Sequence, residues 1–175
     1  MLDELQKLAD KIAQMAIDAV ANEWKAQGHN LTGSAIKNME TVIHTETDKI
    51  IIEGFVPDYM AINNKGVLAT KIPYYPGSGR KESEYIKGLM RYAKQRFGAS
   101  DKEAKSIAFA IASKHKKEGM PTIGSKRFSQ TGKRTGFIEQ ALDKKEAEMA
   151  DLINRAITYS IQTTVETFYK SILNR

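Results

Sequence analysis

The chain has 175 residues, of which 41% are hydrophobic and 27% charged, and its formal net charge is +6. These values are typical of a soluble protein of one domain, or of one domain with an interaction arm. The absence of cysteine excludes disulfides, thiol catalysis and thiolate metal sites. No apolar run reaches the roughly 18 residues that span a bilayer, and the acidic N-terminus is unlike a signal peptide. We therefore expect synthesis in the cytoplasm and no membrane partner.

Residues 2–27 predict a long amphipathic helix, which Gly28 ends. We expect its apolar stripe to join the core. Trp24, near the end of the helix, is expected to anchor it against the body of the protein or against a neighbouring subunit. The stripe consists of side chains at three- and four-residue steps, namely Leu5, Leu8, Ile12, Met15, Ala19 and Val20.

Two β-rich runs follow, at residues 41–45 and 50–56. The polar segment between them, residues 46–49, predicts a hairpin turn, and Pro57 ends the pairing. The run from Ile50 to Ile52 is apolar on both faces, so at least part of it should be buried. Residues 59–64 predict a single helical turn closed by Gly66.

Residues 67–81 read as loop, and two helices are predicted after it. The first covers residues 84–97 and ends at Gly98. The second covers residues 100–117 and opens with Ser100 and Glu103, the spacing of a capping box, in which each side chain satisfies a free backbone N–H. We expect residues 81–120 to form a helical insertion within the single domain.

Residues 114–134 hold seven Lys and Arg residues against one acid, Glu118. The net charge of this segment is therefore +6, which equals the net charge of the whole chain. The segment is rich in Gly, Ser, Thr and Pro, so it predicts a long basic loop and not a charged helix face. Such a loop suits a nucleic-acid backbone or an acidic partner surface. A loop that is basic for solubility is the alternative. The expected partner- or DNA-facing residues are Lys114, Lys116, Lys117, Lys126, Arg127, Lys133 and Arg134.

From about Thr135 a helical pattern runs almost to the end of the chain, and no glycine or proline interrupts it after Gly136. A straight helix of that length would extend about 55 Å at 1.5 Å per residue. A domain of this size is narrower, so the helix should either kink or pack on a neighbour. We expect this C-terminal arm, residues 135–175, to make oligomer contacts. Its apolar positions are Ile138, Leu142, Met149, Ile153, Ile157, Ile161, Val165, Phe168 and Ile172.

The chain shows no arrangement typical of catalysis. His29, His44 and His115 are far apart and lack metal-ligand spacing. The segment 131–135 resembles a phosphate-binding loop, but Arg127 stands where the first glycine belongs. Glu53, a single acid in a strand, makes no active site. We expect no enzyme activity, no catalytic residue, no metal and no cofactor; a hydrolase or nuclease would need clustered acids or a His–acid pair.

The two predicted helices at residues 84–117 resemble a helix-turn-helix in outline. The first of them carries Lys87, Arg91, Lys94 and Arg96. The second presents mainly alanine and lysine, without the Asn or Gln that read bases, so sequence-specific DNA recognition is the weaker alternative.

The order of the motifs resembles one known family. A long helix is followed by Leu31-Thr32-Gly33-Ser34, a hairpin, the segment from Tyr59 to Gly66, and the late segment from Gly136 to Leu142. This pattern is similar to the neck and tail-completion proteins of tailed bacteriophages. Those proteins show an L-x-T-G or T-G-x-L step, a hairpin, Y-A-x-x-x-E-x-G, and P-F-L-x-x-A-L before the last helix. The resemblance covers about half of the chain.

Three positions depart from the family pattern: Met60 replaces alanine, Asn64 replaces the acid, and Gly136 replaces proline. The resemblance implies an α+β fold, with a long N-terminal helix packed on a small antiparallel sheet, to which this chain adds a helical pair and a long C-terminal helix. It also implies a structural virion protein of the head–tail junction. Such a subunit would form a homo-oligomeric ring and contact neighbouring head-completion and tail proteins.

In this interpretation the basic segment faces packaged DNA, by backbone contacts indifferent to sequence, or grips an acidic neighbouring ring. The alternative is a sequence-nonspecific nucleic-acid-binding protein that uses the same segment. The residues expected at the assembly interface are Trp24, Tyr59, Phe137, Ile138, Leu142, Ile161 and Phe168.

Overall fold

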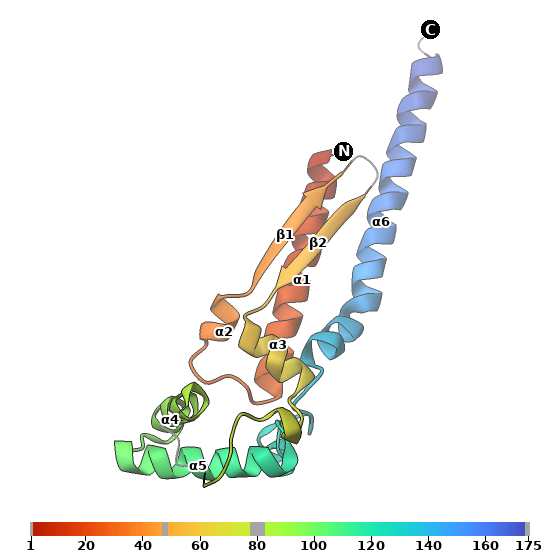
Figure 1. Cartoon of the computed structure of the whole chain (residues 1–175). Helices are drawn as coiled ribbons and strands as arrows, with labels where there is room; N and C mark the ends of the chain where they lie inside the picture. Colours follow the sequence, from red (N-terminus) through yellow and green to blue (C-terminus); the bar gives the residue numbers. More distant parts are fainter. Residues whose placement is uncertain (1, 47–48, 78–82, 174–175) are drawn as a thin grey trace. The chain divides into compact units, whose positions relative to one another are not determined.

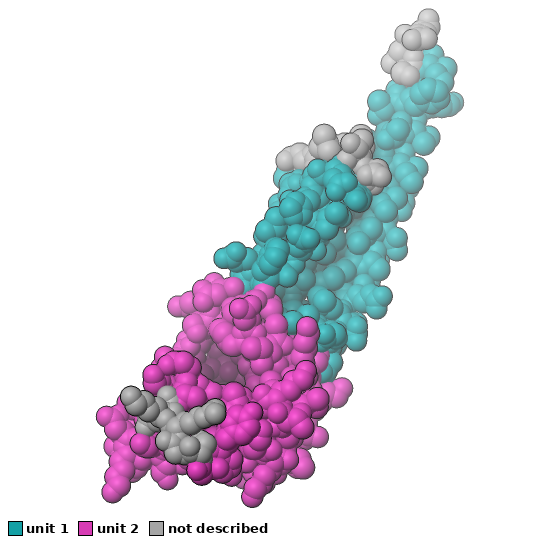
Figure 2. All heavy atoms as spheres, in the orientation of Figure 1, with its two compact units in different colours: residues 1–23, 39–55, 138–175 teal, residues 24–38, 56–137 magenta. Residues whose placement is uncertain are grey.

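The computed structural model describes residues 2–46, 49–77 and 83–173. It confirms an α+β fold, in which a mostly helical chain carries one two-stranded antiparallel sheet and a long helix at each end (Figure 1). The chain forms two compact units where one domain was expected (Figure 2). Unit 1 comprises residues 1–23, 39–55 and 138–175, and unit 2 comprises residues 24–38 and 56–137.

Unit 1 combines most of α1 (Leu2–Ala26), the strands β1 (Glu40–Thr45) and β2 (Ile50–Phe55), and nearly all of α6 (Phe137–Leu173). Three of the buried positions of α1 in this unit are small, namely Ala9, Ala13 and Ala21. Small side chains let neighbouring segments approach closely; of the predicted stripe Val20 is buried, and the other members are half-buried. The helix prediction for residues 2–27 is therefore confirmed to within one residue.

The strands form the predicted hairpin, with a register that runs from Glu40 opposite Phe55 to Thr45 opposite Ile50. Ile50, Ile51 and Ile52 are half-buried. Figure 1 shows the hairpin alongside α1, and the Thr45 hydroxyl donates to Oε1 of Gln6 at 3.2 Å. The Glu46 amide donates to the Lys49 carbonyl at 2.9 Å. Two residues of the predicted turn, 47 and 48, lie outside the described residues.

Unit 2 holds the remaining helices. These are α2 (Ser34–Lys37), α3 (Asp58–Lys65), α4 (Glu84–Phe97) and α5 (Asp101–Glu118), with the 3-10 turns η1 (Ala69–Lys71) and η2 (Ile123–Phe128). The single turn expected at residues 59–64 is therefore a helix of two turns. Of the predicted loop at 67–81 and the predicted insertion at 81–120, residues 78–82 lie outside the described residues.

The end of α4 and the start of α5 lie where the sequence predicts them. Gly98 caps α4 in the left-handed conformation at φ 64°. Ser100 and Glu103 form the predicted capping box of α5, with each side chain bonded to the other's backbone amide. Between the two helices Ile86, Ala108 and Ala112 are buried, and a ring of larger side chains covers them, namely Tyr74, Tyr85, Leu89, Met90 and Phe109. No helix in the described part of the chain is long and apolar enough to cross a membrane.

Candidate functional site

The basic residues of segment 114–134 do not share one loop. Lys114, Lys116 and Lys117 lie in the last turn and a half of α5, which runs to Glu118. The loop prediction is wrong for this part because the helix that the capping box starts continues until Gly119 stops it. Basic side chains at this position are favoured by the negative end of the helix dipole. A second part, residues 123–128, forms η2.

Two of these lysines are bonded within the protein itself. Lys114 forms an ion pair with Glu118, one turn further along α5. The Lys116 Nζ donates to the Ile72 carbonyl at 3.1 Å and lies 4.8 Å from the centre of the Tyr75 ring. These contacts assign Lys116 a local structural role, whereas Lys114 forms a surface pair and stays exposed.

Lys117, Lys126, Arg127 and Lys133 are exposed. The guanidinium of Arg127 stacks over the neighbouring Phe128 ring at 4.7 Å. With Lys114, the exposed cations of the segment therefore lie on the end of α5, on η2 and in the loop that follows η2.

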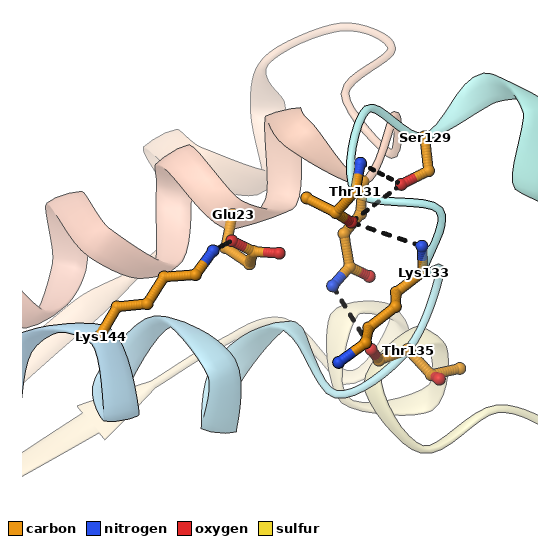
Figure 3. Close-up of polar contacts among 7 residues, drawn as sticks. Glu23, Ser129, Thr131, Lys133, Thr135 and Lys144 are labelled. Atoms are coloured by element: carbon orange, nitrogen blue, oxygen red, sulfur yellow. Dashed lines mark hydrogen bonds and ion pairs between the residues drawn. The ribbon is translucent and has the colours of Figure 1, made fainter.

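Hydroxyl groups hold the loop after η2 in one conformation (Figure 3). The Thr131 amide donates to Oγ of Ser129 at 3.2 Å, and the Lys133 amide donates to Oγ1 of Thr131 at 3.4 Å. The two hydroxyls lie 3.0 Å apart. The Gln27 amide group donates to the Thr135 carbonyl at 3.3 Å. Side chains thus fix the path of the backbone that presents Lys133.

Arg134 is half-buried and does not face solvent as predicted. Its Nη1 donates to the Gly28 carbonyl at 3.2 Å, while its Nε is buried and has no partner among the described residues. Burial lowers the pKa of the guanidinium from its usual value, and the nearby positive charge of Arg96 lowers it further, although Tyr92 acts in the opposite direction. Arg134 therefore connects the basic segment to the end of α1.

Gly28 is required for this connection. Its φ is 74°, and a Cβ at this position would lie 2.2 Å from the Phe128 carbonyl oxygen and 2.8 Å from Nη1 of Arg134. The approach between the end of α1 and η2 is closer than any side chain permits.

Trp24 and Phe137 form the aromatic centre of unit 2, with ring centroids 5.0 Å apart in an edge-on arrangement. Trp24 is 3% exposed and Phe137 is fully buried. Both were predicted at an assembly interface, but the protein's own core covers them. For Trp24 the structure confirms the other expectation, that it packs against the body of the protein. Tyr59 lies edge-on to Trp24 at 6.5 Å but keeps an exposed face, and Ile138 is half-buried.

His29, expected as a loop residue without a partner, belongs to the same cluster. Its ring stacks on Trp24, and its Nε2 lies 3.1 Å from the Arg134 carbonyl. Burial, followed by the charge of Arg134, lowers the pKa of His29 to about 4, and the hydrogen bond to the carbonyl opposes this shift. The ring is therefore neutral at pH 7, and Nε2 carries the proton because a carbonyl can only accept.

The predicted C-terminal helix is present as α6, which has 37 residues and bends in its first turns (Figure 1). The predicted interface residues Leu142, Ile161 and Phe168 are exposed on it. Ile161 and Phe168 belong to a longer set of exposed hydrophobic side chains, which we call the α6 stripe. Its members follow one another at steps of three or four residues, namely Ile153, Ile157, Ile161, Val165, Phe168 and Ile172.

A groove of about 480 Å³ lies in unit 1 between the start of α1 and the C-terminal half of α6. Glu4 lines it from α1, and Tyr159, Thr163 and Phe168 are among the residues that line it from α6. Deeper in unit 1, the Lys144 Nζ donates to the buried Glu23 carboxylate at 2.6 Å, which connects α6 to α1 (Figure 3).

Two histidines form pairs that the sequence did not reveal. His44 and Glu53 lie 3.1 Å apart on the hairpin, with both side chains about half exposed. The Tyr85 hydroxyl lies 2.7 Å from Nδ1 of His115. Burial raises the pKa of Tyr85 to about 12 and lowers that of His115, so the tyrosine donates to a neutral ring. Within the described residues, no cluster of three potential ligands could hold a metal ion.

Comparison with protein-family models, curated proteins and solved structures finds no match to this chain. The interpretation of its function therefore depends on the sequence motifs and on the surfaces described above. Of the predicted site residues, the structure leaves Lys117, Lys126, Arg127 and Lys133 available for an anionic partner. It leaves Tyr59, Leu142, Ile161 and Phe168 available for an apolar one.

Proposed function

We propose that this protein is a structural virion protein of the phage head–tail junction, a ring subunit that joins the head-closure side to the tail. The observation that carries the proposal is the α6 stripe. Soluble monomers rarely expose a contiguous apolar surface of this extent, and surfaces of this kind mark contacts with other proteins. The residues that resemble the neck and tail-completion family give the kind of assembly.

The α6 stripe suits contact between copies of this chain. Its residues recur along one side of the helix from Ile153 to Ile172, which is about 28 Å at 1.5 Å per residue. A neighbouring subunit that covers this side would remove from water the side chains that the single chain leaves exposed. A head-to-tail contact between copies gives a ring when the rotation from one subunit to the next closes.

The basic residues give this subunit a second contact. In the assembled ring Lys126, Arg127 and Lys133 would face DNA in the channel or an acidic surface of the next ring. Their side chains are exposed, and the backbone that carries Lys133 is fixed by the hydroxyls of Ser129 and Thr131. Any contact with DNA would be made with phosphates and would not depend on base sequence.

Substitution of Ile161 by Glu tests the assembly proposal. The residue is exposed, so the variant should fold, and a charge in the centre of the α6 stripe should prevent association. The matched control is Gln162→Glu, which adds the same charge one residue away on the exposed surface of the same helix. Light scattering during size exclusion should show an oligomer for wild type and for Gln162→Glu, and a smaller species for Ile161→Glu.

Sequence-nonspecific nucleic-acid binding by the isolated chain is the alternative, and the cluster of exposed cations at Lys126, Arg127 and Lys133 favours it. If all three neutralise phosphates, the logarithm of the affinity for duplex DNA should fall with a slope of about −2.7 against the logarithm of salt concentration.

Fluorescence anisotropy between about 50 and 200 mM salt measures this slope. Replacement of Lys126, Arg127 and Lys133 by glutamine should remove this salt dependence. The same change at three exposed lysines elsewhere should leave it unchanged; these are Lys11, Lys25 and Lys37. No affinity at about 50 mM salt, where electrostatic binding is strong, rules this alternative out.

A further inference from the structure

Unit 2 contains a cavity of about 630 Å³. Its walls come from the segment after α1, from α3, from the ends of α4 and α5, and from η2. The face of unit 2 that is turned toward the viewer in Figure 2 is hollowed. The volume falls in the range of roughly 300 to 1,000 Å³ that is usual for small-molecule sites.

The charge in this cavity is of one sign. Arg96, Arg127 and Arg134 line it, and no Asp or Glu is among its described lining residues. Arg96 and Arg134 both belong to the lining of this one cavity. Neither forms an ion pair with a carboxylate of the described residues. Two neighbouring guanidinium groups without a counter-ion favour an anion, and their planar donors match carboxylate and phosphate oxygens.

Trp24 closes the inner end of the cavity. It is among the lining residues and is only 3% exposed, so the indole belongs to the buried wall and not to the open rim. A ligand in the cavity would therefore lie beside this indole.

The remaining wall offers flat apolar surface. Tyr92, Phe97 and Phe128 line the cavity while keeping large parts of their rings exposed. Tyr92 and Phe97 stand edge to face, with ring centroids 6.1 Å apart at 90°. Rings in this arrangement present a face on which a planar group can stack.

We propose that the cavity of unit 2 binds a small organic anion in which one carboxylate or phosphate group is joined to a flat apolar body. Arg96 and Arg134 hold the oxyanion, and the flat body packs against the aromatic wall. The residues of this binding site belong to unit 2, whereas the α6 stripe belongs to unit 1.

Three probes with one flat body test the chemistry: 1-naphthoate, 1-naphthyl phosphate and the neutral 1-naphthylmethanol. Isothermal titration calorimetry of the full chain gives their affinities. We expect at least one of the anions to bind ten or more times more tightly than the neutral compound. The tighter of the two anions identifies whether the natural ligand carries a carboxylate or a phosphate.

Trp24 is the only tryptophan in the sequence, so its indole N–H gives one resolved cross-peak in a ¹⁵N–¹H spectrum. That cross-peak should move on addition of the anion that binds. Arg96 is exposed and its replacement should not unfold the chain, so Arg96→Gln should weaken anion binding about tenfold while leaving the spectrum of the free protein largely unchanged. Arg91→Gln, on the same helix but outside the cavity, is the matched control and should bind as wild type does.

Four outcomes would each overturn the proposal. The first two are a neutral probe that binds as tightly as the anions, and anions that do not bind at all. The others are an indole cross-peak that stays in place at saturation, and equal affinities for the Arg96→Gln and Arg91→Gln variants.

Discussion

The imidazole of His29 stacks on the indole of Trp24, with ring centroids 4.4 Å apart and planes inclined by 24°. The pair joins the end of α1 to the far end of the basic segment, because Nε2 of His29 also bonds to the Arg134 carbonyl. A loop histidine thus becomes part of the core of unit 2, and its protonation state matters for stability.

Acid should destabilise the protein through His29. Its pKa is about 4 in the folded state and about 6.5 when unfolded, so the unfolded chain binds the extra proton between these values. Stability is therefore fully present above about pH 6.5 and is lost as the pH falls toward 4. Since the ring is partly exposed, solvent screening reduces the effect to on the order of 1 kcal/mol.

Urea unfolding at pH 7.0 and 5.0 measures this loss. The variant His29→Gln keeps a donor for the Arg134 carbonyl but cannot titrate, so part of the pH dependence should disappear. His44→Gln, on the exposed hairpin, is the control. An unchanged pH dependence in His29→Gln would show that the His29 ring does not carry the effect.

Gly28 should tolerate substitution less well than Gly33. The two glycines have nearly the same φ, 74° and 76°, so alanine costs about 1 kcal/mol at either position from backbone strain. A Cβ at Gly28 also meets the Phe128 carbonyl, whereas a Cβ at Gly33 meets nothing within 4 Å. Gly28→Ala should therefore lose at least about 1 kcal/mol more than Gly33→Ala, since η2 has to move. Equal losses in thermal or urea unfolding would contradict the close approach.

Phe137 should be a core residue and not an interface residue. The change Phe137→Ala leaves a cavity beside Trp24 and should lower the free energy of unfolding by about 3–5 kcal/mol. Phe97→Ala, at a ring that is 60% exposed, should cost less than about 1 kcal/mol. If Phe137→Ala instead leaves stability intact and weakens self-association, Phe137 is an interface residue and not a core residue.

The contact between Lys144 and the buried Glu23 should stabilise unit 1 more than the neighbouring surface pair does. Because Lys144 is itself largely exposed, Lys144→Met should cost about 1–2 kcal/mol. Lys145 pairs with the exposed Glu148 one turn away, so Lys145→Met should cost less than about 0.5 kcal/mol. Chemical unfolding of the two variants measures the loss in free energy of unfolding for each pair. Equal losses would show that the burial of Glu23 does not strengthen its pair with Lys144.

Local signals predicted the helices and the hairpin well, because the residues that set their ends act on their immediate neighbours. Gly98, Ser100 and Glu103 fix the junction of α4 and α5 through bonds within a few residues of each other. The basic segment was mispredicted at its start because its composition was averaged over 21 positions, whereas Lys114 to Lys117 continue a helix that begins at Asp101.

The candidate sites were harder to predict, because burial and pairing depend on contacts distant in sequence. Trp24 and Phe137 lie more than a hundred residues apart, and their apolar character fits a core and an interface equally well. Folding brings Arg96 to the same cavity as Arg134 and places His115 beside Tyr85. The spacing of these residues in the sequence does not predict either arrangement. The exposed side of α6 was predictable, since its length exceeds what one compact domain can cover.

Self-assembly through the α6 stripe is the central claim, and electron microscopy of the purified protein tests it most directly. Wild type and Gln162→Glu should form discrete closed rings, and Ile161→Glu should form none while retaining its circular dichroism spectrum. Rings formed equally well by Ile161→Glu, or a wild-type protein that remains a single chain at every concentration studied, would contradict the account.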